Sequence, residues 1–376
     1  MSRARLRDLG LEVGTLPPGP FNAITDVAGV KVGYATVIQD RPRIARTGVT
    51  AIWPRGQEIW TDYVFAGTFS FNGNGEMTGL PWLAEQGLLG APIGITNTYQ
   101  VGIVRDAITA MAVRDGASQA FHLPVVAETY DGWLSDIQGF TLTQEHAFAA
   151  FDSAVGGCAI AEGNVGGGTG MICHGFKGGI GTASRVTETA AGPYTVGVLV
   201  QANHGRRERL RVNGIPIGEL IGADTVPLPE APKRYEQGSG SIIVIVATDA
   251  PLLPHQCMRL AQRSALAVSR LGGSGEQYSG DLMLAFSTGN RGIPPYAWDE
   301  DTDTVRPEVP LRMVAPQLMT RLFDLTIEAT EEAIVNALVA ATTLTGHNGV
   351  TAHALDHDLF QDLFRQDLFH QHQEIR

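Results

Sequence analysis

One serine stands where a flexible segment runs directly into a continuous apolar stretch. The glycine-rich segment 238–240 is followed by Ser241 and then by the apolar residues 242–247. A short run rich in β-branched residues and preceded by glycines is typical of a buried strand. Gly240 leaves its own carbonyl sterically open and tolerates strain, so the Ser241 hydroxyl is placed to cut the chain at the Gly240–Ser241 bond. Taken alone, the same residues also fit an ordinary Gly-Ser turn at a strand entry.

A nucleophilic serine needs a base, and the sequence contains neither a GxSxG elbow nor an SxxK motif. Cleavage before Ser241 would free the α-amine of that residue. An α-amine has an ordinary pKa of about 7.7 to 8.0, so a useful fraction is neutral at physiological pH. The amine would then accept the hydroxyl proton, and one residue would supply both nucleophile and base.

Other polar residues follow expected strands, at positions where binding and catalytic side chains often collect. Glu128, Tyr130 and Asp131 follow a short apolar run, and Asn203 ends a Val-rich run. Without further context, the two acids are solvated turn residues, Tyr130 is a half-buried packing residue and Asn203 is a turn former.

The most glycine-dense part of the chain comprises residues 163–170 and 175–181. Neither GxGxxG nor GxxxxGK[ST] is completed there, since Lys177 is followed by Gly178. A nucleotide site is therefore not expected. We expect these glycines to let backbone pack closely around a substrate or between strands.

The elements that must position these residues are strands and helices in mixed order. Apolar periodicity predicts helices near residues 101–113, 145–155, 254–271 and 317–344, and strands near 24–37, 90–98, 194–202 and 282–286. Such pieces are able to pack as sheet on sheet with helices outside.

Composition narrows the possible partners. The 376 residues carry 27 basic and 39 acidic side chains, a net charge of −12, which argues against nucleic acid as a partner. No apolar stretch of about 18 residues occurs and the basic N-terminus leads into no apolar segment, so we expect a cytoplasmic protein with no membrane partner.

Metals and cofactors are not expected either. Cys158, Cys173 and Cys257 show no CxxC spacing and are interpreted as small core residues. His353 and His357 have i, i+4 spacing, but no HExxH pattern accompanies them in the C-terminal tail.

Six motifs in order give the chain a resemblance to a known family over nearly its whole length. It resembles the self-processing L-aminopeptidase/D-esterase and β-aminopeptidase family, serine peptidases with an N-terminal nucleophile. The motifs are residues 22–27 with 30–33, 128–132, 163–170, 200–203, 240–243 with 247–251, and 279–281.

The resemblance implies an α+β fold, an αββα four-layer sandwich like that of N-terminal-nucleophile hydrolases. The precursor would cut itself between Gly240 and Ser241. The α-chain, residues 1–240, and the β-chain, residues 241–376, would stay together as one structural domain. Four such pairs would form a tetramer.

Site roles follow from the same resemblance. Ser241 would be the nucleophile, Ser279 and Asp281 would support its amine and hydroxyl, Tyr130 with Asn203 would stabilise the oxyanion, and Glu128 would hold the ammonium of the substrate. The β-aminopeptidase branch is associated with Glu at the position of Asp281, so Asp favours the L-aminopeptidase/D-esterase branch.

The expected function is therefore a self-activating aminopeptidase that takes small peptides, amino-acid amides or esters through an acyl-enzyme on Ser241. One alternative is an N-acyl transferase of the ornithine-acetyltransferase type, although that class would use Thr at the cut. The other alternative is a glycine-rich binding protein without turnover.

Overall fold

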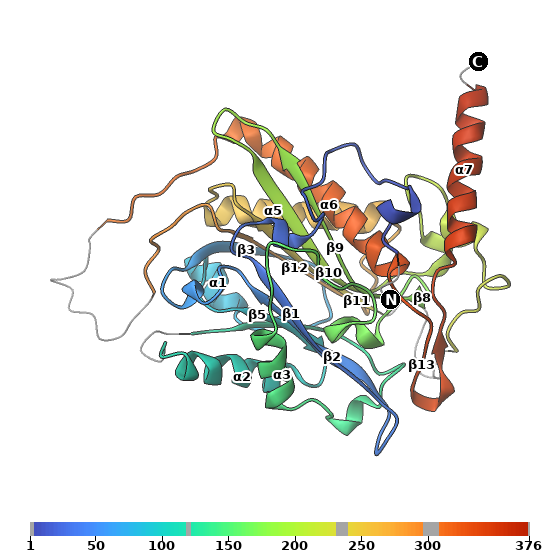
Figure 1. Ribbon diagram of the computed structural model, residues 1–376, viewed down its shortest axis with the longest axis horizontal. Coiled ribbons are helices and arrows are strands. Elements are labelled where there is room, and N and C mark those ends of the chain that lie inside the picture. Colours follow the sequence, from blue (N-terminus) through green and yellow to red (C-terminus); the bar gives the residue numbers. More distant parts are fainter. Residues whose placement is uncertain (1–3, 118–121, 231–239, 296–307, 375–376) are drawn as a thin grey trace.

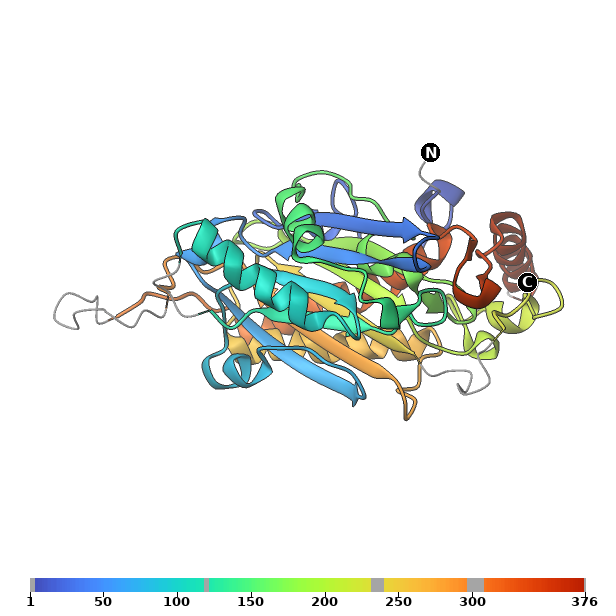
Figure 2. The ribbon, with the colours of Figure 1, turned by 90° about the horizontal axis from the view of Figure 1, so that it is seen from below.

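The structure is a computed structural model that describes residues 4–117, 122–230, 240–295 and 308–374. Two β-sheets lie face to face in the middle of the molecule, with helices on both outer sides (Figures 1 and 2). The expected α+β sandwich is thus confirmed.

The smaller sheet has four strands in the order β1-β2-β5-β6 and the larger has six in the order β4-β3-β12-β11-β10-β9. Neighbouring strands are antiparallel except for the pairs β5/β6 and β11/β12, which are parallel. The strands of the smaller sheet are β1 (Lys31–Gln39), β2 (Ala45–Trp53), β5 (Ile93–Asn97) and β6 (Val125–Thr129). Those of the larger sheet are β3 (Val64–Gly73), β4 (Leu88–Leu89), β9 (Gly179–Thr187), β10 (Tyr194–Asn203), β11 (Ser241–Thr248) and β12 (Gly280–Ser287).

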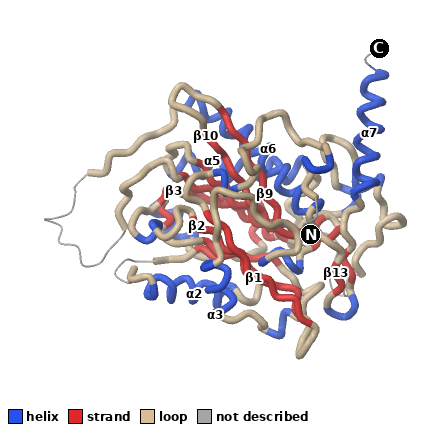
Figure 3. Tube along the Cα trace, in the orientation of Figure 1, coloured by secondary structure: helices blue, strands red, loops and turns tan. Residues whose placement is uncertain are grey.

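Helices α2 (Val101–Arg114) and α3 (Gln144–Asp152) cover the smaller sheet, and α5 (Pro254–Arg270) and α6 (Met319–Val339) cover the larger one. The remaining helices are α1 (Leu80–Gln86), α4 (Ile217–Leu220) and α7 (His357–Glu374), and two short strand pairs are β7 (Ile172–Cys173) with β8 (Phe176–Lys177) and β13 (Leu344–Thr345) with β14 (Thr351–Ala352). Helix α7 stands away from the layers, as the tube in Figure 3 shows. Within the described residues no helix is long and apolar enough to cross a membrane.

Strand β11 is buried on both faces, which explains its continuous apolar run. Ile242, Val244 and Val246 belong to the core beneath the helices α5 and α6. Ile243 and Ile245 belong to the core between the sheets. Because side chains alternate along a strand, Ser241 lies on the same face as Ile243 and is directed between the sheets.

The glycine-rich segment packs between strands, as expected. Residues Gly166–Gly170 form a short 3₁₀ helix, and every one of them is buried. A Cβ on Gly167 would lie 2.2 Å from Gln201 Oε1, and one on Gly168 would lie 2.4 Å from the amide nitrogen of Ile180. Only glycine permits this separation between the segment and the strands.

Several sequence expectations are corrected in detail. The last long helix ends at Val339, five residues before the expected end. Cys173 and Cys257 are buried core residues, but Cys158 is only partly buried, so the interpretation of all three as core residues is wrong. Asp131 is completely buried and is not a solvated turn residue.

Candidate active site

Ser241 begins the central strand of the larger sheet, between β10 and β12. It pairs with Asn203 on the antiparallel side and with Gly280 on the parallel side. The side chain is 6% exposed, and its Oγ accepts a hydrogen bond of 3.1 Å from the amide of Gly280. The same amide lies 3.2 Å from the carbonyl oxygen of Gly240.

Gly240 is a position where a side chain does not fit. A Cβ there would lie 2.0 Å from the carbonyl oxygen of Asn203 and 3.0 Å from the Cα of His204. Gly240 therefore lies directly against the end of β10. This close approach is the physical reason for the glycine that precedes the serine.

Ser279 and Asp281 flank Gly280 and contact each other. The hydroxyl of Ser279 donates a hydrogen bond of 2.5 Å to Asp281 Oδ1. Burial raises the pKa of Asp281 to about 6, against the opposing effects of Ser279 and of the Ile242 backbone. The carbonyl of Ser279 accepts a hydrogen bond from the side-chain amide of Asn72, which fixes the backbone of this segment.

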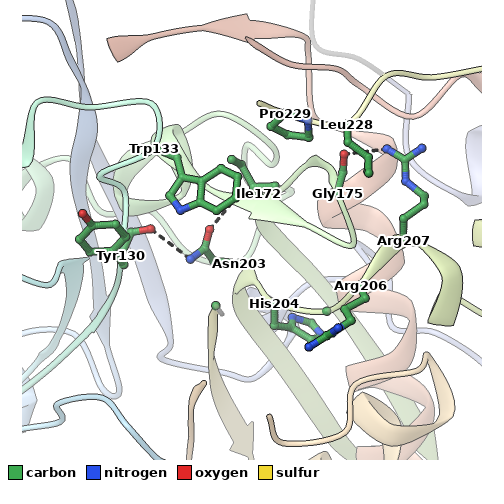
Figure 4. A pocket seen from close by; sticks show the side chains of 12 residues that line it. Tyr130, Trp133, Ile172, Gly175, Asn203, His204, Arg206, Arg207, Leu228 and Pro229 are labelled. Atoms are coloured by element: carbon green, nitrogen blue, oxygen red, sulfur yellow. Dashed lines mark hydrogen bonds between the residues drawn. The ribbon is translucent and has the colours of Figure 1, made fainter. Parts of the chain in front are cut away.

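Asn203 is held by two backbone groups (Figure 4). Its Oδ1 accepts from the amide of Ile172 at 2.8 Å, and its Nδ2 donates to the carbonyl of Tyr130 at 3.1 Å. The Ile172 amide only donates and the Tyr130 carbonyl only accepts, so the orientation of the Asn203 amide is determined. One N–H of Asn203 is thereby engaged, and its second N–H remains for another acceptor.

The ring of Tyr130 lies over Gly132. A Cβ at Gly132 would be 2.3 Å from both the Cζ and the Oη of Tyr130. The absence of a side chain at Gly132 therefore lets the phenol occupy its place at the site.

Glu128 is 3% exposed and is fixed by two donors, the amide of Glu76 at 2.9 Å and the hydroxyl of Thr98. Burial raises the pKa of Glu128, and the two hydrogen bonds oppose that effect. A Cβ on Gly75 would lie 3.2 Å from Glu128 Oε1 and 3.0 Å from the Cα of Gly280. Glu128 therefore lies across a narrow gap from the residue that contacts Ser241.

A pocket opens beside these residues. Its wall includes Tyr130 and Asn203 at one end and Gly240 near the strand end, with apolar contacts from Trp133, Ile172, Leu228 and Pro229 and two arginines, Arg206 and Arg207. Arg206 forms an ion pair of 2.8 Å with Glu276, and Arg207 donates to backbone carbonyls including that of His174. The pocket thus reaches the residue that precedes Ser241.

The structure places Gly240, Asn203, Ser279 and Asp281 around Ser241, with Glu128 and Tyr130 beside them, and it adds other residues. Lys177 was considered only as a phosphate-binding residue, yet it is completely buried and its Nζ donates to the carbonyls of Gly168, Met171 and Gly178. Asp131 follows Tyr130 in the chain, and burial raises its pKa to about 7. In the sequence, the only sign of this role is that Lys177 is a polar residue among glycines.

The chain is similar to known proteins over most of its length. β-Peptidyl aminopeptidase BapA of Sphingosinicella microcystinivorans is 47% identical over 366 residues, which covers 94% of this chain and 90% of that protein. A second BapA, from Sphingosinicella xenopeptidilytica, is 45% identical, with 94% and 89% covered.

Two solved structures share the fold. A Burkholderia sp. β-aminopeptidase superposes with a TM-score of 0.88 at 47% identity, over 96% of this chain and 99% of that one. The L-aminopeptidase D-Ala-esterase/amidase of Ochrobactrum anthropi, described as a prototype of the serine aminopeptidases with a variant of the N-terminal-nucleophile hydrolase fold, gives 0.85 at 40% identity over 96% and 98%.

The match to the family itself is extensive. The pattern of peptidase family S58 covers residues 22–352, from the segment before β1 to the end of β14. These findings do not favour the acyl-transferase and binding-protein alternatives, and the chain belongs to peptidase family S58.

Proposed function

We propose that this protein is a self-processing serine aminopeptidase whose nucleophile and base are both supplied by Ser241. The observation that carries the proposal is the position of Ser241 Oγ, which lies between the Gly280 amide and the strand end that bears Asn203. Family membership supports the hydrolytic activity.

Activation proceeds within the chain. Ser241 Oγ attacks the carbonyl carbon of Gly240, the C–N bond breaks, and the hydroxyl proton passes to the departing α-nitrogen of Ser241. Water then hydrolyses the resulting ester, which leaves the Gly240 carboxylate and a Ser241 with a free amine and a free hydroxyl. The products are the chains 1–240 and 241–376.

Turnover uses the same atoms. The free amine of Ser241 takes the Oγ proton while Oγ attacks the first carbonyl of the substrate, and it returns the proton to the leaving amine or alcohol. The second N–H of Asn203 and the hydroxyl of Tyr130 stabilise the oxyanion; loss of one such donor typically costs about 3 to 4 kcal/mol. The Ser279–Asp281 pair orients the amine of Ser241.

Glu128 binds the ammonium of the substrate, which restricts cleavage to the N-terminal residue. A buried carboxylate with two fixed donors still has lone pairs for an ammonium, and a charge-assisted hydrogen bond is about twice as strong as a neutral one. Small peptides, amino-acid amides and esters present this ammonium next to the scissile carbonyl.

N-terminal β-amino acids are included in the proposed substrate range. The relatives named for β-peptides or β-amino acids match at 45 to 47% identity, against 40% for the L-aminopeptidase. The preference for the L-aminopeptidase/D-esterase branch depends only on Asp281, which is one methylene shorter than the Glu associated with the β-aminopeptidase branch. A comparison of β-alanine, L-alanine and D-alanine p-nitroanilides decides between the branches.

The assembly and location are also proposals. We propose a tetramer of processed pairs on the strength of the family resemblance, and a cytoplasmic location. Size-exclusion chromatography with light scattering, after processing, measures the number of subunits in the assembly.

An intact-mass spectrum tests the processing step. Wild-type protein is expected to give two masses, for chains 1–240 and 241–376, while Ser241→Ala stays whole and inactive. Ser239→Ala, two positions earlier in the sequence, is the matched control and is expected to split as wild type. A wild type that keeps its full mass and hydrolyses none of the p-nitroanilides would exclude the proposed mechanism.

A further inference from the structure

Three potential metal ligands lie together behind the active-site pocket. They are Cys173 at the end of β7, His174 beside it, and His204, which directly follows Asn203. Cys173 and His174 are 0% exposed and His204 is 4% exposed. One ligand atom from each side chain lies within 4.8 Å of the others, and Cys173 Sγ is 3.8 Å from His204 Nδ1.

The tautomer of His174 leaves one ring nitrogen of this cluster residue unprotonated. Its Nδ1 is 3.0 Å from the carbonyl oxygen of Arg206, which only accepts hydrogen bonds, so Nδ1 carries the proton. Nε2 is then unprotonated, and it is buried without a hydrogen-bond partner among the described residues. An Nδ1–H bonded to a backbone carbonyl is the arrangement that orients histidines bound to metals.

His204 repeats part of this pattern. Its Nε2 also has no hydrogen-bond partner in the part of the chain that the structure describes. Its ring lies edge-on to that of His174, with centroids 5.1 Å apart. Two buried imidazoles with unused nitrogens beside a thiol are more than a packing requirement would produce, because buried polar atoms are normally paired.

The backbone holds the His174 ring in place at a conformational cost. His174 has a φ of +48°, in the left-handed region that few residues other than Gly adopt, although His is among the types enriched there. The ring covers Gly205, where a Cβ would lie 2.3 Å from His174 Cε1. A strained residue packed over a glycine is over-determined by its surroundings, which is common at functional sites.

We propose that Cys173, His174 and His204 bind a Zn²⁺ ion. A thiolate with two neutral imidazoles is a donor set that suits zinc, with three protein ligands and an open fourth position. Bonds of about 2.0 to 2.3 Å in a tetrahedron bring ligand atoms to roughly 3.5 Å from each other, so the cluster contracts by about 1 Å on binding. Coordination replaces the Sγ proton, which leaves to solvent.

Access and charge fit this site. His204 and Gly205 line the pocket, which gives the ion an entry path. Lys177, Arg206 and Arg207 are cations near the cluster; Lys177 and Arg207 donate N–H groups to backbone carbonyls, and Arg206 forms an ion pair with Glu276. The thiolate formed on binding supplies the negative charge that the cluster otherwise lacks.

The ion would fix the end of β10. His204 is bonded to Asn203, and a Cβ on Gly240 would lie 3.0 Å from the Cα of His204. Zinc therefore stabilises the strand end that carries the proposed oxyanion donor and that faces the cleavage segment. No catalytic step passes through the metal, and the site is independent of the proposed peptidase mechanism.

Cobalt titration tests the proposal with a readout other than activity. Full-length protein is stripped with a chelator and titrated with Co²⁺, and Zn²⁺ is then added. We expect one equivalent of Co²⁺ to give a thiolate-to-metal charge-transfer band with the visible bands of tetrahedral Co²⁺, and Zn²⁺ to displace it. Zn²⁺ should also raise the melting temperature.

Matched variants locate the ion. Cys173→Ala is expected to abolish the charge-transfer band, whereas Cys158→Ala and Cys257→Ala, which remove the other thiols, should keep it. His174→Asn preserves a residue that tolerates the left-handed backbone and should weaken Co²⁺ binding at least tenfold. Failure of wild-type protein to give the band, or its persistence in both Cys173→Ala and His174→Asn, would overturn the proposal.

Discussion

The amide nitrogen of Gly280 lies 3.1 Å from the Oγ of Ser241. It is also 3.2 Å from the carbonyl oxygen of Gly240. One N–H is thus directed at the attacking hydroxyl oxygen and at the carbonyl oxygen on which charge develops in the proposed self-cleavage. The parallel register of β11 with β12 produces this relationship, because Gly280 pairs directly with Ser241. A donor fixed by a central sheet needs no rearrangement as charge develops on the carbonyl oxygen.

Gly280→Ala is expected to slow both self-cleavage and turnover by about 10²-fold, a loss that a misplacement of about 1 Å can cause. A Cβ at Gly280 would lie 2.7 Å from the Asn74 carbonyl oxygen and 2.8 Å from the Cα of Gly75, so β12 must shift away from β3. The control is Gly73→Ala, whose Cβ would make only an ordinary contact of 3.5 Å with Ser70 Oγ. Time-resolved intact mass measures the rates; equal rates in both variants would contradict the role of Gly280.

The pKa of Asp281 predicts a pH dependence of catalysis. Burial raises this pKa to about 6, so below that pH the carboxyl is protonated and no longer accepts the Ser279 hydroxyl as a carboxylate. We expect kcat/KM to rise as the pH passes through about 6. In Asp281→Asn the limb near pH 6 should be absent and the activity low, while the rise that comes from deprotonation of the Ser241 α-amine should remain.

Stability should change in the opposite direction over the same range. The folded pKa of Asp281 lies above the unfolded value of about 3.9, so the contribution of this carboxyl to the free energy of unfolding is full below pH 4 and is lost as the pH rises through 6. Denaturant unfolding of wild type and Asp281→Asn between pH 4 and 7 measures the difference. A difference that is independent of pH would exclude the raised pKa.

Gly132→Ala tests the position of the Tyr130 phenol without altering the phenol itself. The added methyl would lie 2.3 Å from Tyr130 Oη, so the ring must move from the site. We expect kcat to fall by roughly 10²-fold, within the range for loss of an oxyanion donor, while the fold is retained. Gly102→Ala, in helix α2 with no atom within 4 Å of its Cβ, should leave kcat unchanged.

The sequence predicts single strands and helices better than it predicts which strands become neighbours. The apolar run of β11 and the periodicity of α5 are local signals, and both elements appear where expected. The pairing of β11 with β12 joins segments separated by helix α5, and no local pattern specifies which strands become neighbours. The layer order came from the family resemblance for that reason.

The same difference holds for the candidate active site. Ser241 and the residues of the shared motifs could be named from the sequence, but their supporting contacts could not. Asp131 stands in an Asp-Gly turn pattern and is nevertheless completely buried, because the neighbouring layers close over it. The cluster that contains Cys173 and His204 could not be recognised from the sequence. Its members come from different elements and match no known metal-ligand spacing.

Lys177→Met is expected to destabilise the protein and to impair catalysis through Asn203. The buried ammonium of Lys177 is bonded to three carbonyls at 2.8 to 3.3 Å, among them that of Met171, which precedes the residue whose amide orients Asn203. Methionine is about as long as the alkyl part of lysine but donates no hydrogen bond, so we expect a loss of about 3 kcal/mol in the free energy of unfolding.

Kinetics separate the two effects of this substitution. If Lys177 positions Asn203, kcat falls at least tenfold with little change in KM, because the oxyanion donor acts in the transition state. Lys31→Met, at an exposed position at the start of β1, is the control and should alter neither stability nor kcat. A Lys177→Met enzyme that is destabilised but retains the wild-type kcat would restrict Lys177 to a structural role and leave the orientation of Asn203 to Ile172 and Tyr130 alone.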